Sequence, residues 1–252
     1  MTVPDLFRRL VDDAAVFPPG DAPLPDALAA YAERRGDQRD LVGSLVVRDT
    51  DLPLLRGFAG PVSVVVTGGA GQLAGPVALC ERLGLALAGV EIALRDLDDL
   101  GGNARRVTTA AADLGDVPLF VELPRGPGEA SWLAAADEVA GAGHRLKFRT
   151  LDLPTPVLAG WIDAALDRET PFKATAGLHH AVRHAQGHGF LNVLAATAAL
   201  WDGGSVDDAV AVLDSPEPPV PDARARRWFT SFGSCSITEP YDDLRTMGLL
   251  DE

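Results

Sequence analysis

The chain has 252 residues, 47% of them hydrophobic, which is enough to bury the core of one large domain or two modest ones. Its formal net charge of -14 argues against partners with anionic surfaces, so neither nucleic acid nor a membrane is an expected partner. Two cysteines are too few for a disulfide framework in a chain of this length. The N-terminus lacks the apolar core of a signal peptide, and no apolar run predicts a membrane span, so we expect a cytoplasmic protein.

The N-terminal half alternates between predicted helices and strands. We expect a short helix over residues 4–11 and a first strand over 14–17, which Pro18, Pro19 and Gly20 end. Nearly continuous apolar runs are typical of buried parallel strands. Such runs predict strands at 41–47, 62–66 and 87–93, with helices at 22–35, 72–83 and 98–114.

The C-terminal half continues the alternation. Strands are predicted at 117–122, 144–150, 171–175 and 229–236, with helices at 129–141, 155–168 and 240–249. Strand starts near 61, 88, 117, 144 and 171 recur at the length of a strand, a loop and a helix. The pattern predicts a single (β/α)8 TIM-barrel domain over 1–252, with a helical insertion at about 189–227 between strands seven and eight. A doubly wound open sheet is the alternative, but no G-x-G-x-x-G fingerprint supports it.

Active sites of such barrels lie at the carboxyl ends of the strands, so inward side chains near those ends are the candidate site. By alternation these are Asp13, Arg48, Thr67, Glu91 or Ala93, Glu122, Lys147, Arg149, Lys173, Thr175, Ser234 and Cys235. Burying an unpaired charge costs on the order of several kcal/mol. We therefore expect Glu91 and Glu122 to pair with Lys147, Lys173 or Arg149.

Two lysines on adjacent strands suggest a reaction. A lysine crowded by a second cation and partly desolvated has a lowered pKa, and its neutral amine can attack a carbonyl group to form a Schiff base. Lys147 and Lys173 are the candidates, and Glu91 and Glu122 are predicted to move protons. The alternative is structural, because ion-paired lysines can simply fill a layer of the barrel.

The order of these motifs resembles the deoxyribose-phosphate aldolase family of class I aldolases along most of the chain. The similar segments are Lys147-Phe148-Arg149-Thr150, Lys173-Ala174-Thr175-Ala176-Gly177, Gly233-Ser234-Cys235-Ser236, Val90-Glu91-Ile92 and Phe120-Val121-Glu122. The resemblance implies a TIM barrel, a Schiff-base lysine on strand six, a second lysine on strand seven, and a turn after strand eight that helps to hold phosphate.

The chain departs from the family pattern at three places. Ala93 stands where the family has a catalytic aspartate on strand four, and Arg149 stands where a small residue is expected. Leu151 and Asp152 replace the usual glycine after Thr150. The sequence therefore predicts a divergent barrel that keeps the lysine pair.

Four of the five histidines follow strand seven and offer a competing chemistry. His180, His184 and His188 are spaced by four residues, which would place them on one helical face as metal ligands. Substrate contacts by His179 or His180 are a second possibility, and ordinary polar loop positions are a third. No metal or other cofactor is included in the main prediction.

The C-terminal turn at 233–236 is a further candidate site. Its backbone N–H groups are placed to bind a phosphate or carboxylate, although a plain turn before a helix fits the sequence equally well. Cys235 lacks an obvious partner for nucleophilic chemistry, except for His179 across adjacent strands.

The sequence thus favours an aldolase-like lyase acting on a small anionic carbonyl or sugar-derived substrate. Lys147, Lys173, Glu91 and Glu122 are the predicted catalytic residues. Substrate contacts are predicted for Arg149, Thr175, His179, His180, Ser234, Arg48 and Asp13. The alternatives are a metal-dependent enzyme that uses the His179–His188 cluster and a barrel that binds a small ligand without turnover. A homo-oligomer is possible in each case.

Overall fold

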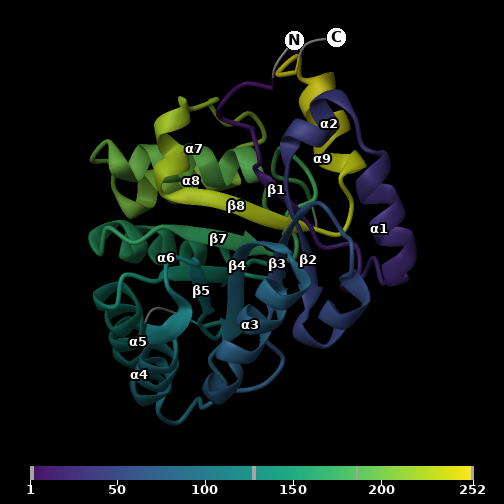
Figure 1. The fold of residues 1–252 in the computed structure, drawn as a ribbon. Helices are drawn as coiled ribbons and strands as arrows, with labels where there is room; N and C mark the ends of the chain where they lie inside the picture. The colour runs from purple at the N-terminus through teal and green to yellow at the C-terminus, as the bar shows by residue number, and fades with distance from the viewer. Residues whose placement is uncertain (1–2, 127–128, 186, 251–252) are drawn as a thin grey trace.

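Eight parallel strands close into a barrel in the computed structural model, which describes residues 3–126, 129–185 and 187–250 (Figure 1). The strands follow chain order around the barrel, and the last pairs with the first. They are Val11–Asp13 (β1), Val42–Arg48 (β2), Pro61–Val65 (β3), Ala86–Ala93 (β4), Leu119–Glu122 (β5), Arg145–Arg149 (β6), Phe172–Thr175 (β7) and Phe229–Ser234 (β8). The predicted (β/α)8 barrel is confirmed, and the open doubly wound sheet is wrong.

Helices surround the barrel (Figure 1). The α-helices are Leu24–Glu33 (α1), Gly36–Leu41 (α2), Ala74–Leu83 (α3), Leu100–Ala110 (α4), Ala130–Gly141 (α5), Thr155–Asp167 (α6), Phe190–Trp201 (α7), Val206–Asp214 (α8) and Thr238–Thr246 (α9). Short 3-10 helices span Asp49–Leu55 (η1), Ala70–Gln72 (η2), Ala112–Leu114 (η3) and Ala223–Arg227 (η4). Among the described residues, none belongs to a helix that is long and apolar enough to cross a membrane.

The segment between β7 and β8 holds α7, α8 and η4. Helix α7 packs against β8 as a crossover helix does in a βαβ unit, and α8 packs on α6 and α7. The side chain of Ser205 accepts a hydrogen bond from the backbone N–H of Asp208, which caps the N-terminus of α8. Helix α7 thus takes the regular barrel position, and α8 and η4 are the additional elements.

The N-terminus differs from the sequence prediction. Residues 5–9 form turns rather than a helix, and the backbone N–H groups of Phe7 and Arg8 both donate to the carbonyl of Pro4. The first strand begins at Val11, ahead of the predicted 14–17. The acidic pair Asp12-Asp13 gave no sign of a strand, because nothing in the local sequence shows that a distant lysine neutralises Asp12 inside the barrel.

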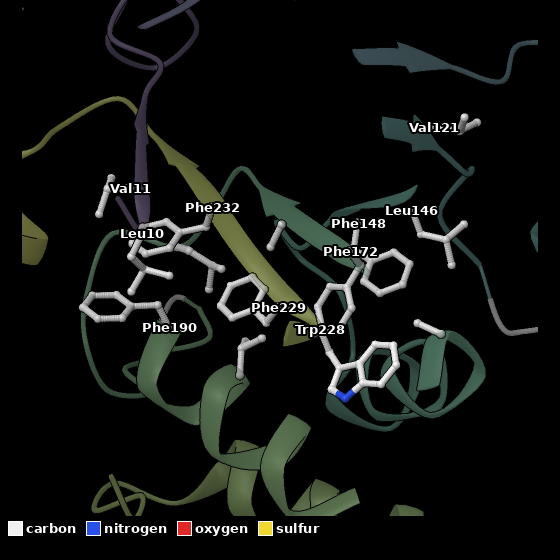
Figure 2. Packing of buried hydrophobic residues seen from close by; sticks show 14 of the residues in the cluster. Leu10, Val11, Val121, Leu146, Phe148, Phe172, Phe190, Trp228, Phe229 and Phe232 are labelled. Atoms are coloured by element: carbon white, nitrogen blue, oxygen red, sulfur yellow. The ribbon is translucent and has the colours of Figure 1, made fainter. Parts of the chain in front are cut away.

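The outer faces of β6, β7 and β8 carry an aromatic core (Figure 2). Phe148 stacks on Phe172 with ring centroids 4.9 Å apart, and Phe172 stacks on Phe229 at 5.4 Å. Trp161 of α6 packs against Phe148 at 5.3 Å. Because strand side chains alternate, burying Phe148 and Phe172 in this outer layer turns their neighbours Lys147 and Lys173 into the lumen.

Candidate active site

Both lysines lie in the lumen, where they alternate with three carboxylates. Lys147 Nζ lies 2.9 Å from Glu91 Oε2 and 2.8 Å from Glu122 Oε2. Lys173 Nζ lies 2.7 Å from Glu91 Oε1 and 2.7 Å from Asp12 Oδ2. Glu91 therefore bridges the two ammonium groups, and the pairing expected from the sequence is present. Three carboxylates against two ammonium groups leave one negative charge in excess.

Strand register explains how these side chains meet. Lys147 is the register partner of Glu122 on β5 and of Lys173 on β7. The side chains of Lys173 and Glu91 are 2% and 3% exposed, against 8% for Lys147 and 18% for Glu122. The cluster therefore opens toward solvent on the side of Glu122.

The charges of this cluster differ from the sequence expectation. Burial alone lowers the pKa of Lys147, but Glu91 and Glu122 outweigh it and raise that pKa above its usual value. Burial likewise lowers the pKa of Lys173, but Asp12 and Glu91 raise it well above its usual range. Burial raises the pKa of Glu91, yet the two ammonium groups lower it to about 2. The predicted lowering of a lysine pKa is therefore wrong for the resting protein, because each ammonium group contacts two carboxylates whose attraction exceeds the effect of burial.

Asp12 is a member of the cluster that the sequence analysis missed. Its Oδ2 accepts hydrogen bonds from Lys173 and from Ser231 Oγ at 2.7 Å, and its Oδ1 accepts one from Ser44 Oγ at 2.7 Å. Ser44 Oγ also lies 2.7 Å from Ser63 Oγ. Placing the first strand correctly at 11–13 would have turned Asp12 inward by alternation, and this was the signal available in the sequence.

A cavity of about 710 Å³ opens above the cluster at the carboxyl ends of the strands. Lys147, Lys173, Glu91 and Glu122 contribute to its lining, together with Arg149 and Thr175 from the ends of β6 and β7. His179, His184 and Cys235 line it from the loops after β7 and β8. Its volume lies within the range usual for small-molecule sites, roughly 300–1,000 Å³.

Four of the predicted contact residues do not line this cavity. Asp13 points outward and pairs with Arg34 at the end of α1 (2.6 Å), because the strand begins earlier than predicted. The guanidinium group of Arg48 lies over the ring of Phe17, 4.5 Å from its centroid. Ser234 is also outward, since Gly233 takes the inward position at the end of β8. His180 Nδ1 lies 3.1 Å from Asp243 Oδ2 of α9.

The histidines have separate partners. The described residues of the segment that contains them, 178–185 and 187–189, form bends, loop and an isolated bridge between His184 and Gly187 rather than the helix that the metal hypothesis required. His188 is buried, where its Nε2 donates to the carbonyl of Leu153 (2.8 Å) and its Nδ1 accepts from Arg183 (3.0 Å). Within residues 3–126, 129–185 and 187–250, no group of three His, Cys, Asp or Glu side chains is placed to hold a metal ion.

Cys235 and His179 approach each other at the rim. The Sγ atom lies 3.9 Å from His179 Nδ1 and 4.0 Å from Nε2, while Nδ1 lies 3.0 Å from Glu239 Oε2. Burial raises the pKa of the Cys235 thiol, and Glu239 adds to this effect. The thiol is therefore less ionised than a free cysteine, which disfavours it as the nucleophile of this cavity.

Comparison with known proteins supports the fold. No family model matches the chain, and no curated protein matches it at a significant level. Among solved structures, the deoxyribose phosphate aldolase from Aeropyrum pernix, described as a unique tetramer, matches with a TM-score of 0.58. The match covers 96% of this chain and 92% of that chain at 13% sequence identity. The fold is a deoxyribose phosphate aldolase-like barrel. At this identity the likeness extends to the fold alone, so the chemistry has to be argued from the residues.

Proposed function

We propose that this chain is an aldolase-like lyase that converts a small anionic carbonyl or sugar-derived compound through a Schiff base on Lys147. One observation carries the proposal. Lys147 and Lys173 are the chain's two lysines, every other basic residue among the 22 Lys and Arg being arginine, and both lie in the lumen. A lysine can give up its proton and attack a carbonyl carbon, whereas an arginine in a protein cannot be deprotonated.

Lys147 is the better nucleophile of the two. Lys173 is almost fully buried between Asp12 and Glu91, with its Nζ 5.2 Å from the centroid of the Phe120 ring. Lys147 lies beside Glu122, the most exposed carboxylate of the cluster. A substrate that enters from the cavity therefore meets the Lys147–Glu122 pair first.

The ion pair supplies the proton transfers that a Schiff base requires. Lys147 passes a proton to Glu122, and the neutral amine adds to the carbonyl carbon while a proton moves from nitrogen to oxygen. Protonated Glu122 then returns its proton to this hydroxyl group, which leaves as water. The resulting iminium ion carries the positive charge that the ammonium carried. Glu91, 2.9 Å from Lys147 Nζ, stabilises that charge.

The resting charge state sets the condition for this reaction. Excluding water from the cavity disfavours the separated charges of Lys147 and Glu122 relative to the amine and the acid. Substrate binding is therefore the step that frees the amine. Glu91 and Lys173 keep their charges throughout, and the iminium replaces the Lys147 ammonium. The net charge of the cluster is therefore the same before and after iminium formation.

Other parts of the proposal concern the substrate and the assembly. Arg149 and His179 line the cavity beside Lys147 and suit the anionic group of the substrate. The proposal keeps the cytoplasmic location expected from the sequence. It also includes a homo-oligomer, since the Aeropyrum pernix enzyme is described as a tetramer.

A non-catalytic ligand-binding barrel is the second candidate. One observation favours it: both lysines are fully paired with carboxylates, as in a structural layer of a barrel lumen. In this candidate the cavity binds the same class of anion, and Lys147 stays an ammonium group throughout.

Reductive trapping separates the two candidates. Wild-type protein is incubated with 2-oxobutyrate or glyceraldehyde 3-phosphate, reduced with borohydride, and examined by intact mass and peptide mapping. We expect one adduct on Lys147, absent from Lys147→Arg, which keeps a cation between Glu91 and Glu122 but forms no Schiff base. Lys173→Met is the companion variant. The absence of any adduct, or an adduct that persists in Lys147→Arg, would sink the Schiff-base mechanism.

A further inference from the structure

The cavity above the lysines has one wall that is almost entirely apolar. Phe17, Pro18 and Pro19 contribute to it from the loop after β1. Val46, Val65 and Ala93 contribute from the carboxyl ends of β2, β3 and β4. A barrel mouth that bound only a small hydroxylated compound would have polar groups here to replace the water around the substrate hydroxyls.

Specific contacts hold Phe17 in its position on the apolar wall. Arg48 lies over the Phe17 ring at 4.5 Å, and its Nη1 donates to the carbonyl of Val16 at 3.4 Å. A stacked guanidinium group and a hydrogen bond to the preceding residue hold the ring in place. Arg48, predicted as a substrate contact, thus supports the wall by holding the Phe17 ring in place.

The opposite wall carries the cations and most of the polar residues that line the cavity. Arg149 lies two residues beyond Lys147 on the same face of β6, which places their Cα atoms roughly 7 Å apart. Thr175 and His184 line the cavity on this side. Buried His184 Nδ1 has no hydrogen-bond partner among the described residues. An anionic group next to the reacting carbonyl fits between Lys147 and Arg149.

We infer that the substrate is a 2-oxo acid with a hydrocarbon chain, whose carboxylate faces Arg149 and whose chain lies on the Phe17 wall. This inference rests on the proposed function, because the carbonyl carbon must reach Lys147. A three-carbon acid is far smaller than a cavity of about 710 Å³ and leaves the apolar wall in contact with water. Each added methylene removes apolar surface from water and strengthens binding by roughly fourfold.

Calorimetry with 2-hydroxy acids tests the inference without the Schiff base, since these acids have no carbonyl group. Lactate, 2-hydroxybutyrate and 2-hydroxyhexanoate are titrated into wild-type protein. We expect 2-hydroxyhexanoate to bind at least about tenfold more tightly than lactate. Equal affinities along the series would overturn the inference, whatever reductive trapping shows.

Variants locate the effect on the wall. Val65→Thr combined with Ala93→Ser adds hydroxyl groups to the apolar wall, and we expect the preference for 2-hydroxyhexanoate over lactate to fall at least about threefold. The matched control is Val220→Thr, at an exposed position outside the cavity lining, which should leave the preference unchanged. An unchanged preference in the double variant, with its folding verified by thermal unfolding, would place the hydrocarbon chain elsewhere and contradict the inference.

A second arm separates failure of the inference from failure of the proposed function. The corresponding 2-oxo acids, pyruvate, 2-oxobutyrate and 2-oxohexanoate, are trapped with borohydride. If calorimetry shows a chain-length preference but trapping gives no adduct, the ligand class is supported and the Schiff base is refuted. An adduct that forms equally well with pyruvate and 2-oxohexanoate keeps the Schiff base and refutes the ligand class.

Discussion

Glu91→Gln is the most informative stability test of the lumen, because Glu91 is the one carboxylate among the described residues that contacts both lysines. The pKa of Glu91 falls from its usual 4.5 to about 2, which at about 1.4 kcal/mol per pKa unit corresponds to about 3 kcal/mol of stabilisation at neutral pH. The amide has a single acceptor oxygen and turns an NH2 group toward one of the ammonium groups. We expect the variant to lose about 3 kcal/mol of unfolding free energy at pH 7.

The lowered pKa of Glu91 also predicts how the unfolding free energy depends on pH. The folded-state pKa of Glu91 lies below the unfolded value, so the carboxylate stabilises the folded protein above about pH 4.5 and loses this effect as the pH falls toward 2. Urea unfolding followed by tryptophan fluorescence at pH 7, 5 and 3 should show that the deficit in unfolding free energy of Glu91→Gln becomes smaller as the pH falls. Glu138→Gln is the control, since its exposed pair with Arg105 should be worth at most about 1 kcal/mol. A Glu91→Gln protein as stable as wild type at pH 7, or a deficit that is independent of pH, would refute this reasoning.

Two further substitutions test the architecture around the site. Asp12→Asn leaves Lys173 without one of its two carboxylates and should lower the unfolding free energy by about 3 kcal/mol, measured in urea; a loss below about 1 kcal/mol would show that Asp12 is not a structural partner of the lysine. Gly177→Ala should cost at least about 2 kcal/mol in thermal unfolding, because φ is +87° and a Cβ would lie 3.1 Å from Leu151 Cα. Gly57→Ala, with φ +83° and open space, isolates the backbone cost at about 1 kcal/mol, and equal losses in the two variants would contradict the steric argument.

The barrel was predictable from the sequence because its signal repeats. Each buried parallel strand is a short apolar run, and the near-constant spacing of such runs indicates βαβ units whatever the exact ends of each element. The inward direction of Lys147 and Glu122 was predictable from the alternation of side chains along a strand. Alternation from Phe148 and Val121, which both belong to the outer layer, fixes their direction.

Long-range pairing explains the parts that the sequence did not predict. Asp12 was missed because its partner Lys173 is distant in the chain and because two acidic residues rarely indicate a strand. The raised lysine pKa values depend on the number of carboxylates within contact distance, which only the closed barrel determines. The role of Arg48 depends on a loop conformation that no periodicity describes.

The presence of two lysines in the chain allows one direct test of the central claim. In protein labelled with ¹³Cε-lysine, the NMR spectrum at pH 7 should show two signals, both with the shifts of ammonium groups, because carboxylates raise both pKa values. Saturating 2-oxohexanoate should move one signal to the position of a lysine Cε bonded to an iminium nitrogen, and that signal should be missing in Lys147→Arg. A spectrum unchanged by the oxo acid, or a shift confined to the signal that survives in Lys147→Arg, would contradict a Schiff base on Lys147.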